Sequence, residues 1–193
     1  MKTRILLAAA IGSALLLSQA LIAADAKYQA KCPVSGQPAK ETSTVAFEGG
    51  KVQFCCDKCP AAFKADPKKF AAKATLQMLG TGQLAQVACP LSGKACNPDQ
   101  STEIDGVKVS FCCGNCKGAV EKADDKVAKA LGGDKVLAAV TAQTKCPVSD
   151  KAIDPAQSVD YQGKKVYFCC KNCPAAFEKD PSKFTAKLPQ LSK

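Results

Sequence analysis

Cysteines carry most of the chemistry that this sequence can perform. Three times, at a constant interval of 57 residues, a Cys-Pro pair is followed 22 residues later by Phe-Cys-Cys-x-x-Cys. Thiols at fixed spacing bind a soft metal, form disulfides or take part in redox reactions. Twelve of the 13 cysteines lie in this frame: Cys32, Cys55, Cys56, Cys59, Cys89, Cys112, Cys113, Cys116, Cys146, Cys169, Cys170 and Cys173.

Each repeat offers four thiols, the number that a closed tetrahedral metal site needs. The chain has no histidine, which removes the usual general base and the commonest nitrogen ligand. It also has no serine-nucleophile motif, phosphate-binding loop or dinucleotide fingerprint, so we predict no enzymatic activity. Sulfur ligands select zinc, copper(I) or similar thiophilic ions. We therefore expect one thiolate-bound zinc or copper ion per repeat.

The two adjacent cysteines of each repeat have different expected positions. Neighbouring residues on a strand point to opposite faces. Extending the alternation of Val52 and Phe54 places Cys56 on their face and Cys55 on the other. Either Cys55 completes a three-thiolate site, or Cys56 joins through the Cys-x-x-Cys knuckle, or a kink at the strand end brings in both.

The elements that must position these thiols recur with the cysteines. Two β-rich runs meet at Gly49, Gly106 and Gly163, which predicts a short hairpin in each repeat. A helical pattern then begins at the last cysteine, with Pro60 and Pro174 in its first turn. The free N–H groups of a helix start stabilise a thiolate there. The fold class is therefore small α+β, with tandem treble-clef-like modules stapled by metal or by disulfides.

The segments after these helices differ among the repeats. Asp66-Pro67 and Asp180-Pro181 predict a second short helix in the first and third repeats. In the first repeat a connector at Ala71–Leu79 follows. The middle repeat lacks this signal, so its helix is predicted to continue without a break to Leu131. A further helix is expected from Lys135 to about Gln143.

The first residues resemble an export signal. Lys2 and Arg4 precede an apolar run, and Ala24-Asp25-Ala26 fits a signal-peptidase site. An uncleaved anchor is the alternative. We expect a periplasmic or extracellular protein with no membrane insertion after cleavage. The predicted organisation is a signal peptide at 1–26, unit one at 27–79, unit two at 84–143 with a degenerate C-terminal part and an extra linker helix, and unit three at 144–193.

The formal charge of +10 does not predict nucleic-acid binding. The only arginine is Arg4, inside the predicted signal peptide, and arginine is the preferred reader of phosphates and bases. The lysines are scattered along the chain. We interpret them as a solvated surface that balances anionic thiolate centres.

The motifs resemble those of the YHS and TRASH families. These motifs are Cys-Pro-Val-Ser-Gly, Gly-x-x-Val-x-Phe-Cys-x-x-x-Cys and Phe-x-x-Asp-Pro-x-x-Phe, the last of which unit two lacks. The resemblance implies treble-clef-like modules that bind copper or another heavy metal, without catalysis. The second cysteine of each adjacent pair is an addition to the family pattern. The family ligands map onto Cys32, Cys55 and Cys59, onto Cys89, Cys112 and Cys116, and onto Cys146, Cys169 and Cys173.

These observations predict an exported heavy-metal-binding protein that serves in sequestration, trafficking or resistance. A metal-transport or efflux protein is the expected partner. The alternatives are an interaction module stapled by structural zinc or by disulfides and, more remotely, a thiol–disulfide redox protein. Cys96 lies outside the frame, and is either a fifth thiol of the middle site or a thiol left free or paired between molecules.

Overall fold

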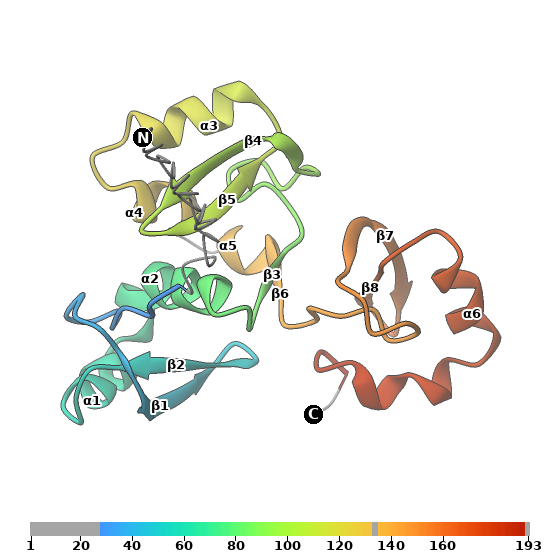
Figure 1. The fold of residues 1–193 in the computed structure, drawn as a ribbon, viewed down its shortest axis with the longest axis horizontal. Coiled ribbons are helices and arrows are strands. Elements are labelled where there is room, and N and C mark those ends of the chain that lie inside the picture. Colours follow the sequence, from blue (N-terminus) through green and yellow to red (C-terminus); the bar gives the residue numbers. More distant parts are fainter. Residues whose placement is uncertain (1–27, 133–134, 192–193) are drawn as a thin grey trace, which may run out of the picture.

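The computed structural model describes residues 28–132 and 135–191, so the predicted signal peptide lies outside the described residues. Three β-hairpins follow one another along the chain, each succeeded by a helix (Figure 1). The predicted small α+β class is therefore confirmed. The hairpins are β1 Lys40–Phe47 with β2 Gly50–Phe54, β4 Asn97–Ile104 with β5 Val107–Phe111, and β7 Asp154–Tyr161 with β8 Lys164–Phe168.

Each hairpin closes through a two-residue turn at the predicted glycine. In unit one both turn residues, Glu48 and Gly49, have positive φ, at 46° and 82°. Asp105-Gly106 and Gln162-Gly163 repeat these values closely. A positive φ at both turn positions matches the right-handed twist of the flanking strands, and glycine adopts it at little cost. The same turn fixes the same strand register in all three units.

The helix after each hairpin seals a small core. These helices are α1 Cys59–Ala65, α3 Gly114–Glu121 and α6 Cys173–Lys179. In unit one Phe63 packs edge-on against Phe54, with ring centroids 5.4 Å apart, and Phe177 packs against Phe168 at 5.5 Å in unit three. Unit two has the smaller Val120 at the equivalent position. Leu76, from outside the unit, packs into its core and supplies further apolar volume.

Leu76 belongs to α2, Pro67–Gly80, a single helix of 14 residues. The prediction of a short helix followed by a connector at Ala71–Leu79 was therefore wrong. The Asp66 cap was placed correctly, because its carboxylate accepts the N–H of Lys69. The helix continues because its two sides have different neighbours: Met78 packs into the core of unit one and Leu76 into that of unit two.

The later part of unit two also differs from the prediction. Its helix does not run without a break to Leu131, because α4, Lys126–Leu131, begins afresh where Asp125 accepts the N–H of Ala128. The cap lies two residues beyond the expected register and has no proline after it. The predicted helix from Lys135 to about Gln143 is only α5, Lys135–Ala138.

A small two-stranded sheet lies at the two ends of unit two. The strands β3, Ala85–Gln86, and β6, Val140–Thr141, pair in antiparallel fashion. This ladder joins the first and last segments of unit two, as Figure 1 shows near the centre of the molecule. In the tail of unit three the predicted short helix is two 3-10 turns, η1 Pro181–Lys183 and η2 Thr185–Lys187.

Candidate metal centre

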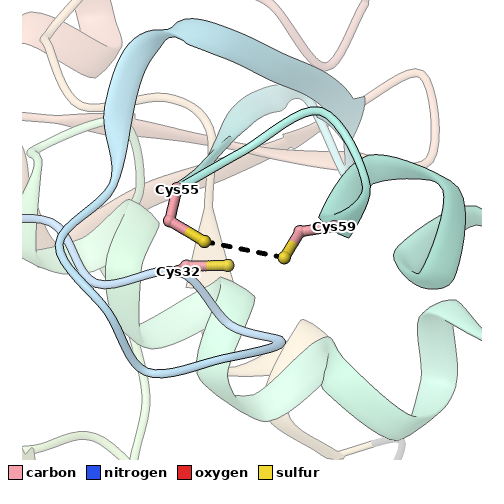
Figure 2. Close-up of side chains that lie close together, drawn as sticks. All are labelled: Cys32, Cys55 and Cys59. Atoms are coloured by element: carbon pink, nitrogen blue, oxygen red, sulfur yellow. Dashed lines mark hydrogen bonds between the residues drawn. The ribbon is translucent and has the colours of Figure 1, made fainter.

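The structure gathers three cysteines of each unit into a triad. The Sγ atoms of Cys32, Cys55 and Cys59 all lie within 4.8 Å of one another, and Figure 2 shows the three side chains converging from separate segments. The Sγ atoms of the second and third triad members are 3.6 Å apart in unit one and 3.7 Å apart in the other two. The equivalent triads are Cys89, Cys112 and Cys116, and Cys146, Cys169 and Cys173.

These spacings suit a shared metal ion. Four sulfurs at a zinc–sulfur distance of about 2.3 Å lie about 3.8 Å from one another in a tetrahedron. A disulfide requires about 2.05 Å between its sulfurs, and no two cysteines of the described residues are joined in this way. Each triad is thus positioned to hold a metal ion, with a donor set that selects thiophilic ions.

The first cysteine of each triad lies in a tight loop at the bottom of the site. In unit one the Cys32 N–H donates to the Gln37 carbonyl at 2.7 Å, and the Gly36 N–H donates back to Cys32 at 2.8 Å. The loop needs a positive φ, which Gly36 and Gly93 supply at 74° and 71°. In unit three Asp150 takes this conformation with φ of 59°.

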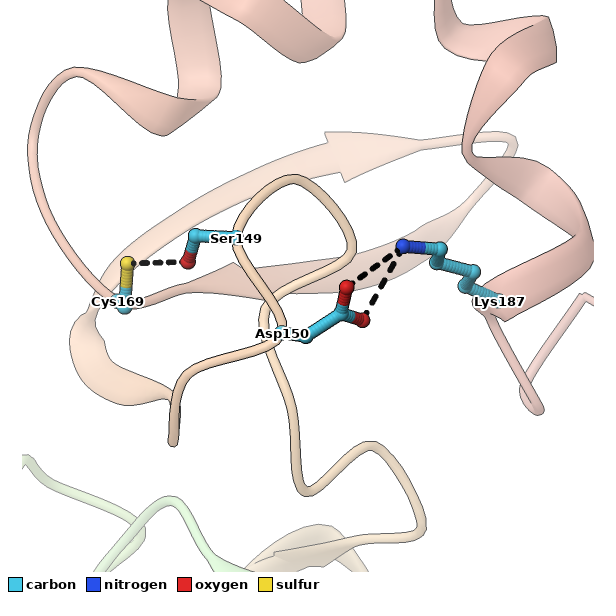
Figure 3. A network of polar contacts seen from close by, with 4 residues as sticks. All are labelled: Ser149, Asp150, Cys169 and Lys187. Carbon is cyan, nitrogen blue, oxygen red and sulfur yellow. Dashed lines mark hydrogen bonds and ion pairs between the residues drawn. The ribbon is translucent and has the colours of Figure 1, made fainter.

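Asp150 also ties this loop to the tail of its unit. Lys187 donates to both carboxylate oxygens of Asp150, at 3.1 and 2.9 Å (Figure 3). Both side chains are largely exposed, so the ion pair itself contributes little stability. Its geometric effect is to hold η2 beside the loop that carries Cys146.

The loop prepares its cysteine to be a thiolate. Burial raises the pKa of Cys32, but hydrogen bonds from the Ser35 hydroxyl and from backbone N–H groups outweigh that effect and lower the pKa to about 7. The same causes lower the pKa of Cys89 and Cys146 to about 7. Each site therefore has one thiol that is partly ionised at neutral pH. This ionisation favours metal binding, because the thiolate is the form that coordinates a metal.

A serine hydroxyl supports each triad, and the sequence reasoning did not single it out. Ser35 Oγ lies 3.2 Å from Cys55 Sγ, and Ser92 Oγ lies 3.2 Å from Cys112 Sγ. Ser149 and Cys169 make the same contact at 3.0 Å (Figure 3). The signal in the sequence was a serine three residues after the first cysteine of every repeat. A hydroxyl at this place helps to orient the ligand sulfur.

A glutamine joins the two segments that lead to the first and second cysteines of the triad, and sequence reasoning missed this residue too. Gln143 donates to the carbonyls of Tyr167 and Lys145 and accepts the Tyr167 N–H. Lys145 directly precedes Cys146, and Tyr167 lies two residues before Cys169. The amide therefore fixes the separation of two ligand-bearing segments.

The same bridge recurs in the other units. In unit two Gln86, which is 57 residues before Gln143, bonds Ser110 and Ala88. In unit one the repeat-equivalent Gln29 is exposed, and Gln77 from α2 makes the bonds to Gln53 and Lys31 instead. The equal spacing of Gln86 and Gln143 was the available signal, whereas nothing in the repeat pointed to Gln77.

The third cysteine of each triad lies at the start of a helix, as predicted. Cys59 and Cys173 open their helices, and Cys116 lies in the first turn of α3. We predicted that the helix start stabilises a thiolate at this cysteine. In the metal-free protein this prediction was wrong. Burial, neighbouring thiols and the charge of the first cysteine raise the pKa of Cys59, and they raise the pKa of Cys116 and Cys173 to about 12. A bound cation would remove this penalty on a second negative charge.

The remaining cysteine of each adjacent pair lies outside the triad and is exposed. Strand alternation predicted Cys56 on the side of Val52 and Phe54, and this was wrong because β2 ends at Phe54. The chain bends there and turns Cys55 toward Cys32. Cys56 Sγ nevertheless stays 3.5 Å from Cys59 Sγ, and Cys170 and Cys173 show the same distance. In unit two Cys113 lies 3.6 Å from Cys112.

Cys96 is not a member of the middle triad. Its half-buried thiol donates to the Ser110 carbonyl at 3.4 Å and lies 3.5 Å from Gln86 Nε2. Burial raises its pKa to about 11. Cys96 therefore packs beside the glutamine bridge of unit two and not in the middle site, and its predicted role as a thiol left free or paired between molecules stays a prediction.

A scan against protein-family models and searches of curated proteins and of solved structures gave no match. Among the described residues, no helix combines the length and apolar character that a membrane span requires.

Proposed function

We propose that this chain is an exported heavy-metal-binding protein that holds a thiophilic metal through cysteine thiolates. The single observation that carries the proposal is the threefold recurrence of the same triad, with Sγ atoms within 4.8 Å of one another. The first thiol of each triad is lowered in pKa to about 7, and a serine hydroxyl contacts the second.

Zinc and copper(I) are the proposed metals, with one ion per unit. The donor set supports this choice, because soft sulfur ligands favour these ions over magnesium or calcium. The resemblance of the motifs to the YHS and TRASH families supports the same reading. The metal is then a cargo that the protein sequesters, passes to a transport or efflux partner, or withholds from sensitive targets, and no catalytic role is proposed.

The number of bound metals tests the proposal. Protein purified anaerobically from its own compartment is analysed for metals and for free thiols. We expect about three metal ions per chain, one for each triad. Replacement of a complete triad by serine, as in C32S/C55S/C59S, should remove one ion, whereas C96S should remove none.

The two alternatives give different results in the same experiment. A disulfide-stapled protein would contain no metal and almost no free thiol. A structural zinc module would keep its zinc in the presence of excess copper(I), and its fold would be lost when a chelator removes the zinc. Either result would contradict a role in handling a heavy-metal cargo.

A further inference from the structure

The thiols of each unit form a gradient of exposure to solvent. In unit one Cys32 is only 1% exposed at the bottom of the site and Cys59 is 8% exposed. Cys55 is half-buried, while Cys56 is exposed. An ion that approaches from solvent therefore meets Cys56 before it meets the triad.

The exposed thiol is within reach of the triad in every unit. Cys56 and Cys170 lie 3.5 Å, sulfur to sulfur, from the third triad member, and Cys113 lies 3.6 Å from the second. These distances are close to the roughly 3.8 Å between two sulfurs on one tetrahedral zinc. One ion can thus contact the exposed thiol and a triad thiol together without a rearrangement of the backbone.

On the basis of the function proposed above, we propose that Cys56, Cys113 and Cys170 are exchange ligands, through which the metal enters and leaves the triads. The triad supplies the three ligands of the stored state. The fourth thiol holds the ion only during transfer, because its exposed position can also be reached by the thiol of a donor or acceptor molecule.

The exchange is a substitution at the metal without electron transfer. The Cys56 thiol loses its proton to solvent and its sulfur bonds to an ion carried by a thiolate donor, while one bond from the ion to the donor breaks and the donor sulfur takes up a proton. The triad thiols that still carry a proton then lose it to solvent as their sulfurs bond to the ion, any remaining bond from the ion to the donor breaks with protonation of the donor sulfur, and Cys56 releases the ion and takes up a proton. The oxidation state of the metal is the same throughout, and the reverse order delivers the ion to an acceptor.

The test compares equilibrium binding with the rate of exchange in the full chain. The variant C56S/C113S/C170S and the wild-type protein are reduced and loaded with Zn²⁺ alone, or with Cu⁺ in a parallel series. Metal per chain is measured first, and then the rate at which a chromogenic thiol chelator removes it. C96S is the matched control, because it removes a thiol that belongs to no triad.

We expect the triple variant to bind as many ions as the wild type and to release them at least about tenfold more slowly, a barrier increase of about 1.4 kcal/mol. A loss of bound ions would overturn the proposal by making the exposed cysteines ligands of the stored state. Equal exchange rates would overturn it by making them bystanders. If the wild-type protein itself takes up no metal, the proposed function fails instead, which keeps the two failures distinct.

Discussion

Gln143 and Tyr167 hydrogen-bond to each other in both directions: the Gln143 side-chain amide donates to the Tyr167 carbonyl at 2.6 Å, and the Tyr167 N–H donates to Gln143 Oε1 at 3.0 Å. The pair occupies the outer edge of β8, where a strand otherwise leaves its N–H and C=O groups unpaired. Because Gln143 also binds the residue before Cys146, one side chain satisfies a sheet edge and sets the spacing of two ligands.

Loss of this amide should destabilise unit three. In Gln143→Ala the buried backbone groups of Tyr167 lose their partners, and each unsatisfied group costs about 1–3 kcal/mol. We therefore expect a decrease of at least about 2 kcal/mol in the free energy of unfolding, measured with denaturant. Gln29→Ala changes the exposed repeat-equivalent residue and should have almost no effect. Equal effects of the two substitutions would contradict a bridging role.

The serine contacts predict weaker metal binding when the hydroxyls are removed. In Ser35→Ala, Ser92→Ala and Ser149→Ala combined, the second triad thiol loses its hydroxyl neighbour and the pKa of the first thiol should rise. Outer contacts of this kind change metal affinity by about 10–100-fold, so we expect at least a tenfold weaker affinity in competition with a chelator. Ser182→Ala, whose hydroxyl contacts Asp180 away from the triad, serves as the control. Unchanged affinity would show that the hydroxyls do not tune the site.

The pKa shifts predict how the stability of the reduced, metal-free protein depends on pH. Cys32, Cys89 and Cys146 have their pKa lowered from 9.0 to about 7, so their contribution is present above pH 9 and is lost as pH falls toward 7. The pKa of Cys116 and Cys173 is raised to about 12, so their contribution is lost as pH rises from 9 toward 12.

Unfolding with denaturant should therefore show stability that increases from pH 7 to pH 9 and then decreases. A decrease of the pKa from 9.0 to about 7 corresponds to at most about 3 kcal/mol of stability for each of these first triad thiols. The variant C32S/C89S/C146S should lose the part of this increase that the three first thiols contribute, whereas Cys56, Cys113 and Cys170, whose pKa is also lowered by hydrogen bonds, keep theirs. A stability that falls steadily across this range would contradict the assignment of the first triad thiol as the ionised one.

The hairpin glycines offer a matched pair of substitutions. Gly49 and Gly163 both have positive φ, so alanine at either position should cost about 1 kcal/mol. A Cβ at Gly49 would lie 3.0 Å from the Cβ of Ala142, whereas one at Gly163 meets no atom within 4 Å. We expect Gly49→Ala to cost about 1 kcal/mol more than Gly163→Ala, because it crowds a packed contact. Equal losses in thermal unfolding would mean that the tip of the first hairpin does not pack against the segment leading to unit three.

The sequence by itself determined the repeated local structure. The glycine in each hairpin turn fixed the strand register, because few other residues accept a positive φ there. The cysteine at each helix start and the three-residue spacing from cysteine to serine are likewise local. Such features depend on residues a few positions apart, so the repeat in the sequence became a repeat in the structure.

The family resemblance implied the three triads, but only the tertiary structure decided between the alternatives for the adjacent cysteines and showed what supports each triad. Cys55 enters the triad because the chain bends after Phe54, at a point where the strand pattern gives no further guidance. Gln77 replaces Gln29 because α2 continues past its expected end to pack between two units. Both outcomes depend on contacts between segments distant in the chain, and packing of this kind overrides the local pattern that a sequence displays.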